Sequence, residues 1–300
     1  MSSSYLYSIV IPHFNSKGKL KRLLKSIPVR QDIQVIVIDD LSTEKSILSI
    51  VDDPDFRHIQ FILSDRKLTA GGARNLGIKY TEGKFLLFAD SDDYFDTKAF
   101  DTFDVYCSSH VDLIQFKVRS FDEDSHMAGT RHLYLEKQYK LFGLTRYLEI
   151  PTPYAKLIRR ELITSHNICF SEVAAGNDLF FSAHVALVAQ NPTFDPSIVY
   201  AVSQNTDSIT ANETSHTTAI RILEHAKKVK LVRELTPLWF WGVYLARRNI
   251  LDMTKEHLSR PIQHQSELEP ELIEASKAYD REIPAWVKKL SSLLKTVTRS

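Results

Sequence analysis

The chain has 300 residues, 43% of them hydrophobic, which is enough apolar surface for one large domain or two modest ones. Its 38 Lys and Arg residues nearly balance its 37 Asp and Glu residues, so we expect no nucleic-acid partner. The two cysteines, Cys107 and Cys169, lack metal-binding spacing and indicate neither a disulfide framework nor a structural zinc site. No apolar run approaches the roughly 18 residues of a spanning helix and no basic segment precedes the first apolar run, which predicts a cytoplasmic protein.

Short apolar runs alternate with segments of helical period in the first third of the chain. The expected strands are residues 7–11, 34–38, 59–63 and 85–88, and the expected helices are residues 19–27, 46–51 and 72–80. Two of these strands, "VIVI" and "FLLF", are apolar throughout, as is usual for strands covered on both faces. The alternation predicts a parallel sheet with helices on both of its faces.

The pattern is less regular beyond residue 120. "RHLYL" (131–135) has the pattern of a strand, and the prolines of "PTPYAKLIRRELITSHN" (151–167) mark a turn before a helix. Another helix is expected directly after Asp178, and from about residue 219 the chain is mostly helical in period. We therefore divide the chain into a first domain, residues 1–215, and a helical C-terminal extension, residues 216–300.

Polar residues follow each of the four expected strands. They are Pro12, His13, Phe14 and Asn15, then Asp39 and Asp40, then Asp65, and then Asp90, Ser91, Asp92 and Asp93. In sheets of this kind ligands bind beyond the carboxyl ends of the strands, so these residues are the candidates for a site. The segment "LTAGGARNLG" adds Gly72, whose backbone can approach a ligand closely, and the guanidinium of Arg74.

Asp90 and Asp92 are two carboxylates one residue apart at the end of a buried strand. Such a pair can reach one divalent cation, Mg²⁺ or Mn²⁺, while a diphosphate supplies further oxygen ligands. The D-x-D pattern also occurs twice elsewhere, at 53–55 and 122–124, where it does not follow an apolar strand. A solvated turn, or a cap for the next helix, is the alternative interpretation, and for Asp93 a helix cap is weighed equally with a role in the site.

The order and placing of several segments resemble family 2 glycosyltransferases of the GT-A fold. These segments are "YSIVIPHFN", "VIVIDDLST", "GGARNLGIKYTEGKFLLFADSDD" and "GNDLFF", and the resemblance is strongest over residues 7–96. It implies an α/β fold with a Rossmann-like mixed sheet and helices on both faces. It also implies a nucleotide-sugar donor and inversion of the anomeric carbon during transfer.

The resemblance assigns the donor to residues along one edge of the sheet. Those residues are Pro12, Phe14 and Asn15 at the nucleoside, Asp39 as acceptor of the uracil N–H with Asp40 beside it, Gly72 and Arg74 near the diphosphate, Asp90 and Ser91 toward the ribose, and Asp92 as the metal ligand. Phe14 departs from the family pattern, because a tyrosine is more usual there. His216 is a candidate third metal ligand, with a surface or packing role as the alternative.

Asp178 in "GNDLFF" matches the position of the family's catalytic base. Inversion needs a carboxylate that takes the proton of the acceptor hydroxyl, and the alternative for Asp178 is an N-cap of the following helix. Asn177 and Lys156 are assigned to the acceptor, with a solvated helix face as the alternative for Lys156.

These assignments predict a metal-dependent inverting glycosyltransferase that moves a sugar from a UDP-sugar to a lipid-linked or oligosaccharide acceptor of a bacterial capsule, O-antigen or lipooligosaccharide. The aromatic and basic tail, residues 286–299, is expected to contact the inner face of the cytoplasmic membrane, and residues 239–248 to pack on the first domain. Two alternatives stay open: a nucleotidyltransferase, and a sugar-nucleotide-binding module without catalysis.

Overall fold

The computed structural model describes residues 5–43, 47–125, 127–204, 214–238, 240, 244, 274–275, 277–278 and 281–282. The strands are β1 (Tyr7–His13), β2 (Ile33–Asp39), β3 (Gln60–Leu63), β4 (Phe85–Phe88), β5 (Tyr94–Phe95), β6 (Leu113–Asp122), β7 (Lys156–Arg159) and β8 (Pro192–Gln204). The helices are α1 (Lys17–Lys25), α2 (Leu48–Val51), α3 (Thr69–Ile78), α4 (Ala99–Asp104), α5 (Leu133–Tyr139), α6 (Gly143–Leu148), α7 (Arg160–Ser165), α8 (Asn177–Val188) and α9 (Ser215–Leu235), with a 3-10 turn, η1, at Pro54–Phe56.

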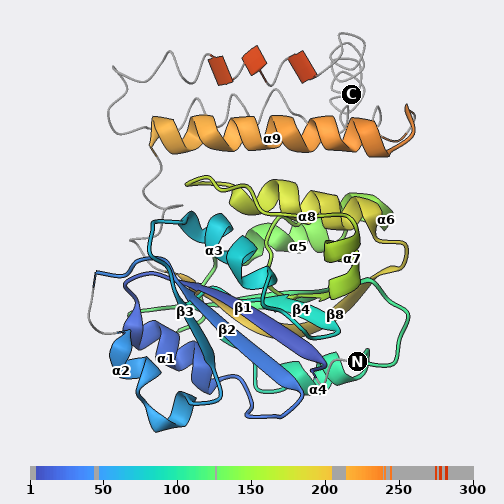
Figure 1. Ribbon diagram of the computed structural model, residues 1–300. Helices are drawn as coiled ribbons and strands as arrows, with labels where there is room; N and C mark the ends of the chain where they lie inside the picture. The colour runs from blue at the N-terminus through green and yellow to red at the C-terminus, as the bar shows by residue number, and fades with distance from the viewer. Residues whose placement is uncertain are drawn as a thin grey trace.

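The described strands form one mixed eight-stranded sheet in the order β3-β2-β1-β4-β7-β6-β8-β5. The first half is parallel, since β1 pairs in parallel with β2 and β4, and β2 pairs in parallel with β3. β7 runs antiparallel to both β4 and β6, and β5 runs antiparallel to β8. Figure 1 shows α1, α2 and α4 on one side of this sheet and α3, α7 and α8 on the other, with α9 beyond α8. The predicted fold class, a mixed α/β sheet covered on both faces with a helix after it, is confirmed.

Alternate residues of β1 enter two separate hydrophobic clusters because side chains of a strand point to opposite faces. Ile9 and Ile11 pack with buried side chains of α1 and α4, whereas Val10 packs with side chains of β4, α8 and α9. Each buried aliphatic side chain of this size contributes about 1.5–3 kcal/mol. The two clusters hold the carboxyl ends of the parallel strands in fixed positions.

Two predicted elements in the second half differ from the structure. "RHLYL" was predicted as a strand, but residues 133–139 form helix α5, which buries Leu135 and Tyr139 at i, i+4 spacing. The helix predicted after the prolines of segment 151–167 begins only at Arg160, because the four residues before it form strand β7. β7 fills the gap between β4 and β6, so its pairing partners, which are distant in sequence, decide its conformation.

The C-terminal part of the described chain lies against the rest of the fold. Ile222 and Val229 of α9 and Tyr244 are buried in the cluster that also holds α8. None of the helices within the described residues is both long and apolar enough to cross a membrane. The predicted membrane-contacting tail, residues 286–299, lies outside the described residues, and so does most of the segment 239–248.

Gly71 of α3 lies where no other side chain fits. A Cβ atom placed on Gly71 would be 2.1 Å from the carbonyl oxygen of Ser171, whereas a Cβ on Gly18 of α1 would meet nothing within 4 Å. We therefore expect Gly71→Ala to lower the free energy of unfolding by about 1–3 kcal/mol, since backbone must move to relieve the overlap. Gly18→Ala is the control and should leave stability unchanged or raise it by up to about 1 kcal/mol. Urea unfolding measures both values, and equal stabilities for the two variants would contradict the prediction.

Candidate active site

A cleft of about 910 Å³ lies beyond the carboxyl ends of β1, β2 and β4, with α8 and α9 on its other side. This volume is in the range of pockets that hold small-molecule ligands. The predicted site residues that line it are Pro12, Phe14, Asp40, Arg74, Asp90, Ser91, Asp92, Asn177 and Asp178. The predicted residues that do not line it are Asn15, Asp39, Gly72, Lys156 and His216.

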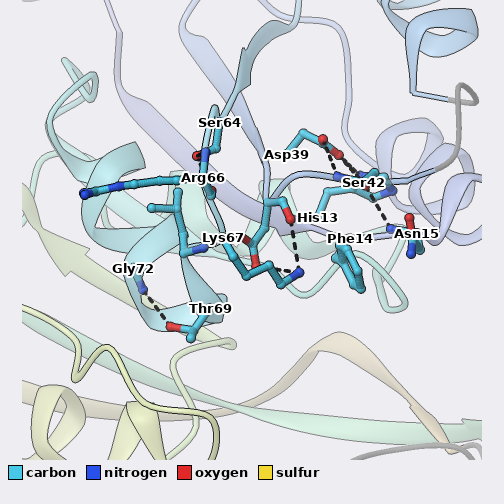
Figure 2. A network of polar contacts seen from close by, with 12 residues as sticks. His13, Phe14, Asn15, Asp39, Ser42, Ser64, Arg66, Lys67, Thr69 and Gly72 are labelled. Carbon is cyan, nitrogen blue, oxygen red and sulfur yellow. Dashed lines mark hydrogen bonds and ion pairs between the residues drawn. The ribbon is translucent and has the colours of Figure 1, made fainter.

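Asp39, at the end of β2, lies just behind the cleft wall in a buried network (Figure 2). Its Oδ1 accepts hydrogen bonds from Ser42 Oγ at 2.6 Å and from His13 Nδ1 at 2.8 Å, and its Oδ2 accepts one from the Ser42 amide at 3.0 Å. His13 Nε2 accepts the Ser16 amide at 3.3 Å, which places the ring proton on Nδ1. Burial opposes ionisation of Asp39, but the bonds from His13 and Ser42 outweigh it and keep the pKa of this carboxyl below its usual value.

The loop after β1 is held to the loop after β2 by similar contacts. The Asn15 amide donates to Ser42 Oγ at 3.0 Å, and Asn15 Oδ1 accepts the Thr43 amide at 2.9 Å. Asn15 adopts a left-handed conformation with φ 48°, which asparagine tolerates better than most residues. The Asn15 side chain therefore shapes the loop that presents Phe14 to the cleft.

Lys67 contacts both Asp40 and Phe14, and Figure 2 shows Lys67 beside Phe14. The Lys67 ammonium lies 3.0 Å from the centroid of the Phe14 ring and 3.1 Å from Asp40 Oδ2. Phe14 is 45% exposed, so its ring offers an open face to a planar group. Gly72, by contrast, lies within α3 near Glu172, and its amide donates to Thr69 Oγ1 at 3.4 Å.

Arg74 connects the two sides of the cleft. It is buried on α3, and its guanidinium donates to Asp90 Oδ1 at 2.5 Å and to Asn177 Oδ1 at 2.9 Å. Its guanidinium carbon also lies 5.2 Å from the centroid of the Phe170 ring. The structure thus brings Arg74, Asp90 and Asn177 together although they come from three different segments. Their contacts hold the Arg74 guanidinium in a fixed position on the wall of the cleft.

The aspartates of the acidic loop after β4, Asp90, Asp92 and Asp93, lie in different environments. Burial and the neighbouring charge of Asp90 raise the pKa of the Asp92 carboxyl. Asp93 is 2% exposed, and burial raises its pKa well above the usual value. Asp93 Oδ1 accepts the Ser203 amide at 2.7 Å, whereas Oδ2 is buried and has no hydrogen-bond partner among the described residues. The interpretation of Asp93 as a helix cap is wrong, because α4 begins at Ala99 after Lys98.

Asp178 lies in the first turn of α8, on the wall that faces the acidic loop. The helix N-cap is Gly176, with φ 69°, so Asp178 is not the N-cap. Burial raises the pKa of the Asp178 carboxyl, while the charges of Arg74 and Lys156 oppose this shift and that of Asp90 adds to it. A carboxylate with a raised pKa next to an open cleft has the properties of a general base.

Lys156 and His216 do not line the cleft. Lys156 is buried on β7 rather than on a solvated helix face, and its Nζ donates to the Ile150 carbonyl at 2.7 Å. Burial lowers the pKa of Lys156 to about 7, with the charge of Asp178 opposing the shift. His216 is exposed in the first turn of α9 and does not line the cleft. Their assigned roles toward the acceptor and the metal stay predictions.

Several cleft residues were not anticipated from the sequence. They are Lys19, Arg131, Tyr134, Glu149, Arg221, His225 and Lys228. Arg221, His225 and Lys228 follow i, i+4, i+7 spacing on α9, a pattern that could have identified them as one helix face. Arg131 and Glu149 carry no comparable signal, because their positions depend on the packing of α5 and α6.

The residues of the acidic loop suit a cation that is shared with a ligand. In the part of the chain that the structure describes, no three His, Cys, Asp or Glu side chains are gathered in a ready-made metal cage. Mg²⁺ in particular is usually held by one or two carboxylates together with substrate phosphates. Asp90 and Asp92 both line the cleft, where one cation could contact both carboxylates and a bound diphosphate. The donor set therefore fits Mn²⁺ or Mg²⁺ bound with a diphosphate.

Residues 8–165 match the family model described as "Glycosyl transferase family 2". This match covers more than half of the 300-residue chain, and the protein therefore belongs to that family.

Curated relatives include the poly(ribitol-phosphate) beta-N-acetylglucosaminyltransferase TarS of Staphylococcus aureus, 26% identical over 194 residues, which are 61% of this chain and 33% of TarS. A UDP-Glc:alpha-D-GlcNAc-diphosphoundecaprenol beta-1,3-glucosyltransferase of Escherichia coli is 31% identical over 91 residues, or 30% of this chain and 36% of that protein. The chain thus spans about a third of the length of each of these two relatives.

Solved structures agree on the fold. Residues 1–349 of S. aureus TarS, crystallised with UDP-GlcNAc, superimpose with a TM-score of 0.76 over 95% of this chain and 83% of that chain, at 20% sequence identity. A mannosyltransferase of Pyrobaculum calidifontis, in complex with GDP-Man and Mn²⁺, gives a TM-score of 0.62 at 12% identity, over 98% of this chain and 81% of that chain. At these identities the likeness supports the fold alone.

Proposed function

We propose that this protein is an inverting glycosyltransferase that moves a sugar from a UDP-sugar to a hydroxyl of an acceptor sugar or polyol during synthesis of a bacterial cell-wall or surface polysaccharide. The observation that carries the proposal is the arrangement of one cleft. Asp90 and Asp92 follow β4 on the sheet side of this cleft, Asp178 lies on α8, and Arg74 of α3 connects the two through hydrogen bonds to Asp90 and Asn177. In an inverting transfer the hydroxyl attacks the sugar on the face opposite the leaving nucleotide, so the two groups need different walls of the cleft.

The named relatives support this class of reaction. The S. aureus relative transfers N-acetylglucosamine to poly(ribitol-phosphate), and the name of the E. coli relative specifies UDP-Glc and a diphosphoundecaprenol-linked sugar. Both are bacterial glycosyltransferases that act on polymers or lipid-linked sugars. Donor and acceptor of the present protein are proposed by analogy with them.

In this proposal the nucleoside lies between Phe14 and the network of Asp39. Uracil carries an N3–H that Asp39 accepts, and the exposed face of the Phe14 ring packs against the base. Pro12, Asn15 and Asp40 shape the same loop pair, and Ser91 lies beside the ribose. Arg74 faces the diphosphate and stabilises the negative charge that the leaving group gains.

Asp90 and Asp92 are the residues that would hold Mn²⁺ or Mg²⁺, with His216 as a candidate third ligand. When bound, the metal supplies Lewis-acid neutralisation of the diphosphate. The protein itself holds the acidic loop in position. Arg74 keeps Asp90 in place through its 2.5 Å hydrogen bond, and Arg22 of α1 donates to the Asp92 carbonyl oxygen, so the acidic loop is held before the donor enters.

On the acceptor side, Asp178 takes the proton of the attacking hydroxyl. Asn177 is fixed by Arg74 at 2.9 Å and lies next to Asp178, where it can orient the acceptor. Lys156 is assigned to the acceptor but does not line the cleft, since its ammonium is buried and donates to the Ile150 carbonyl. Its effect on the acceptor is therefore indirect. Contact of the C-terminal tail with the inner face of the cytoplasmic membrane is part of the proposal and concerns residues outside the described ones.

The nucleotide preference tests the donor assignment. We expect UDP, measured by calorimetry with Mn²⁺, to bind at least about tenfold more tightly than CDP, a difference of 1.4 kcal/mol. The physical reason is that cytosine has no proton on N3 and would leave the buried Asp39 carboxylate facing an acceptor atom.

Asp39→Asn should abolish this preference, whereas Asp65→Asn, at an exposed aspartate after β3, should keep it. Equal affinities of the wild-type protein for UDP and CDP would contradict the donor assignment.

A further inference from the structure

A second pocket, of about 550 Å³, lies beside the main cleft, and the proposed transfer assigns no ligand to it. We call it the α1 pocket. Its lining residues are Arg22, Lys25, Ser26, Tyr94, Arg119, Ser120, Phe121, Met127, Ala128 and His132. Its walls adjoin those of the cleft. Lys19, Asp92 and Arg131 line the cleft, and residues close to them in sequence, Arg22, Tyr94 and His132, line the pocket.

The charge of the α1 pocket is opposite to that of the acidic loop. Arg22, Lys25 and Arg119 line it, and no acidic side chain does so among the residues that the structure describes. By contrast, six carboxylates line the main cleft: Asp40, Asp90, Asp92, Asp93, Glu149 and Asp178. Arg22 and Arg119 are paired with Glu123 and Asp96, which do not line the pocket, so the charged side chains that a ligand would meet there are cationic and favour an anion.

The two guanidiniums are held in place by aromatic rings. The guanidinium carbon of Arg119 lies 5.3 Å from the centroid of the Tyr94 ring, and that of Arg22 lies 4.8 Å from the centroid of Phe121. Arg22 is fixed further by Glu123, which accepts two hydrogen bonds at 2.7 and 3.1 Å. Because these side chains are already ordered, binding an anion costs little side-chain entropy.

Donors remain for a ligand in the α1 pocket. Within the described residues, Arg119 contacts a carboxylate only through Nε, at 3.3 Å from Asp96, so its two terminal nitrogens are available. Lys25 is exposed and makes no hydrogen bond or ion pair in the described part of the chain. His132 uses Nδ1 for Ser120 at 2.7 Å, which leaves Nε2. These groups are the ones that bind phosphate and carboxylate in proteins.

We propose that the α1 pocket is a binding site for an anionic sugar or polyol unit, with Arg119 and Lys25 as its principal contacts. The pocket has room for one anionic group and one ring, and the apolar rim of Met127 and Ala128 faces the uncharged body of the ligand. The site adjoins the acidic loop, because Arg22 of this pocket donates to the Asp92 carbonyl oxygen at 2.5 Å.

The test uses three probes that share a pyranose ring and differ in charge. Glucose 6-phosphate, glucuronate and glucose are titrated into the full chain and followed by calorimetry at low salt. Glucose 6-phosphate and glucuronate should bind, and neutral glucose should not. Arg119→Ala and Lys25→Ala should each weaken binding about tenfold or more, while Arg57→Ala, at an exposed arginine of the η1 turn, should leave it unchanged.

The main cleft also contains cations, so the site of binding is checked with Arg221→Ala. Glucose 6-phosphate binding that survives in Arg119→Ala but is lost in Arg221→Ala belongs to the main cleft and overturns the proposal. Binding of glucose as tight as that of glucose 6-phosphate overturns it as well. The outcome is independent of transferase activity, since no donor nucleotide is present.

Discussion

Asp178→Asn is expected to reduce the rate of sugar transfer by about 10²–10⁴-fold, the usual contribution of a general base. Asparagine keeps the size of the side chain but cannot take the proton of the acceptor hydroxyl. Binding of UDP should be unchanged, because Asp178 is assigned to the acceptor and not to the donor. The measurements are transfer of a radiolabelled sugar at saturating donor, and UDP affinity by calorimetry. Asp101→Asn, at an exposed aspartate on α4, is the control and should keep full activity.

The pH dependence of the wild-type protein gives a second measurement of the same group. Burial raises the pKa of Asp178, and only the ionised form accepts a proton. Activity must therefore fall as the pH is lowered through this raised pKa, with a midpoint above the value near 3.9 of an ordinary aspartate. The residual activity of Asp178→Asn should lack this acid limb. Turnover by Asp178→Asn equal to that of wild type would eliminate Asp178 as the base.

Sequence patterns predicted the first half of the sheet well because its central strands, such as β2 and β4, are buried on both faces. Runs such as "VIVI" and "FLLF" bury every side chain in β2 and β4, so composition alone identifies them. The polar residues after these runs then follow from topology, since parallel strands bring their carboxyl ends to one edge. This reasoning placed Asp40, Asp90 and Asp92 at one cleft.

The second half was predicted less well because long-range contacts determine it. β7 is a strand only because it fills the space between β4 and β6, and α5 has a short pattern that alternation also fits. Environment also separates neighbours that look alike in sequence. Asp93 is buried and bound to Ser203 of β8, a contact across 110 positions that local sequence does not reveal.

The face of α9 that lines the cleft was also difficult to predict from local sequence. Arg221, His225 and Lys228 have helical spacing, yet such spacing is usually that of a solvated face. Only the packing of α9 on α8 turns this face toward the cleft, where Lys228 donates to the Leu148 carbonyl. Local chemistry was thus predictable where strands fix it, and unpredictable where packing between distant helices does.

Asp92→Asn is expected to remove the part of UDP affinity that depends on Mn²⁺. We expect a loss of at least about tenfold, because removal of a group that supports a metal site lowers metal affinity by this much. The variant should fold, because burial and the charge of Asp90 already disfavour an ionised carboxylate at this position. Calorimetry of UDP with Mn²⁺ and with EDTA gives the metal-dependent increment for each protein. Asp124→Asn is a matched control, since it removes the second aspartate of another D-x-D that is exposed to solvent.

The two acidic positions differ in what they present to a ligand, and the comparison depends on that difference. Asp124 lies on an exposed turn after β6, whereas Asp92 lines the cleft beside Asp90 and Arg74. A carboxylate contributes to a shared cation only where a diphosphate can approach it, so Asp124→Asn should keep the whole increment and Asp92→Asn none of it. An increment of equal size in wild type and Asp92→Asn would show that the metal is held elsewhere, and no increment in wild type would show that Arg74 and the cleft bind UDP without metal.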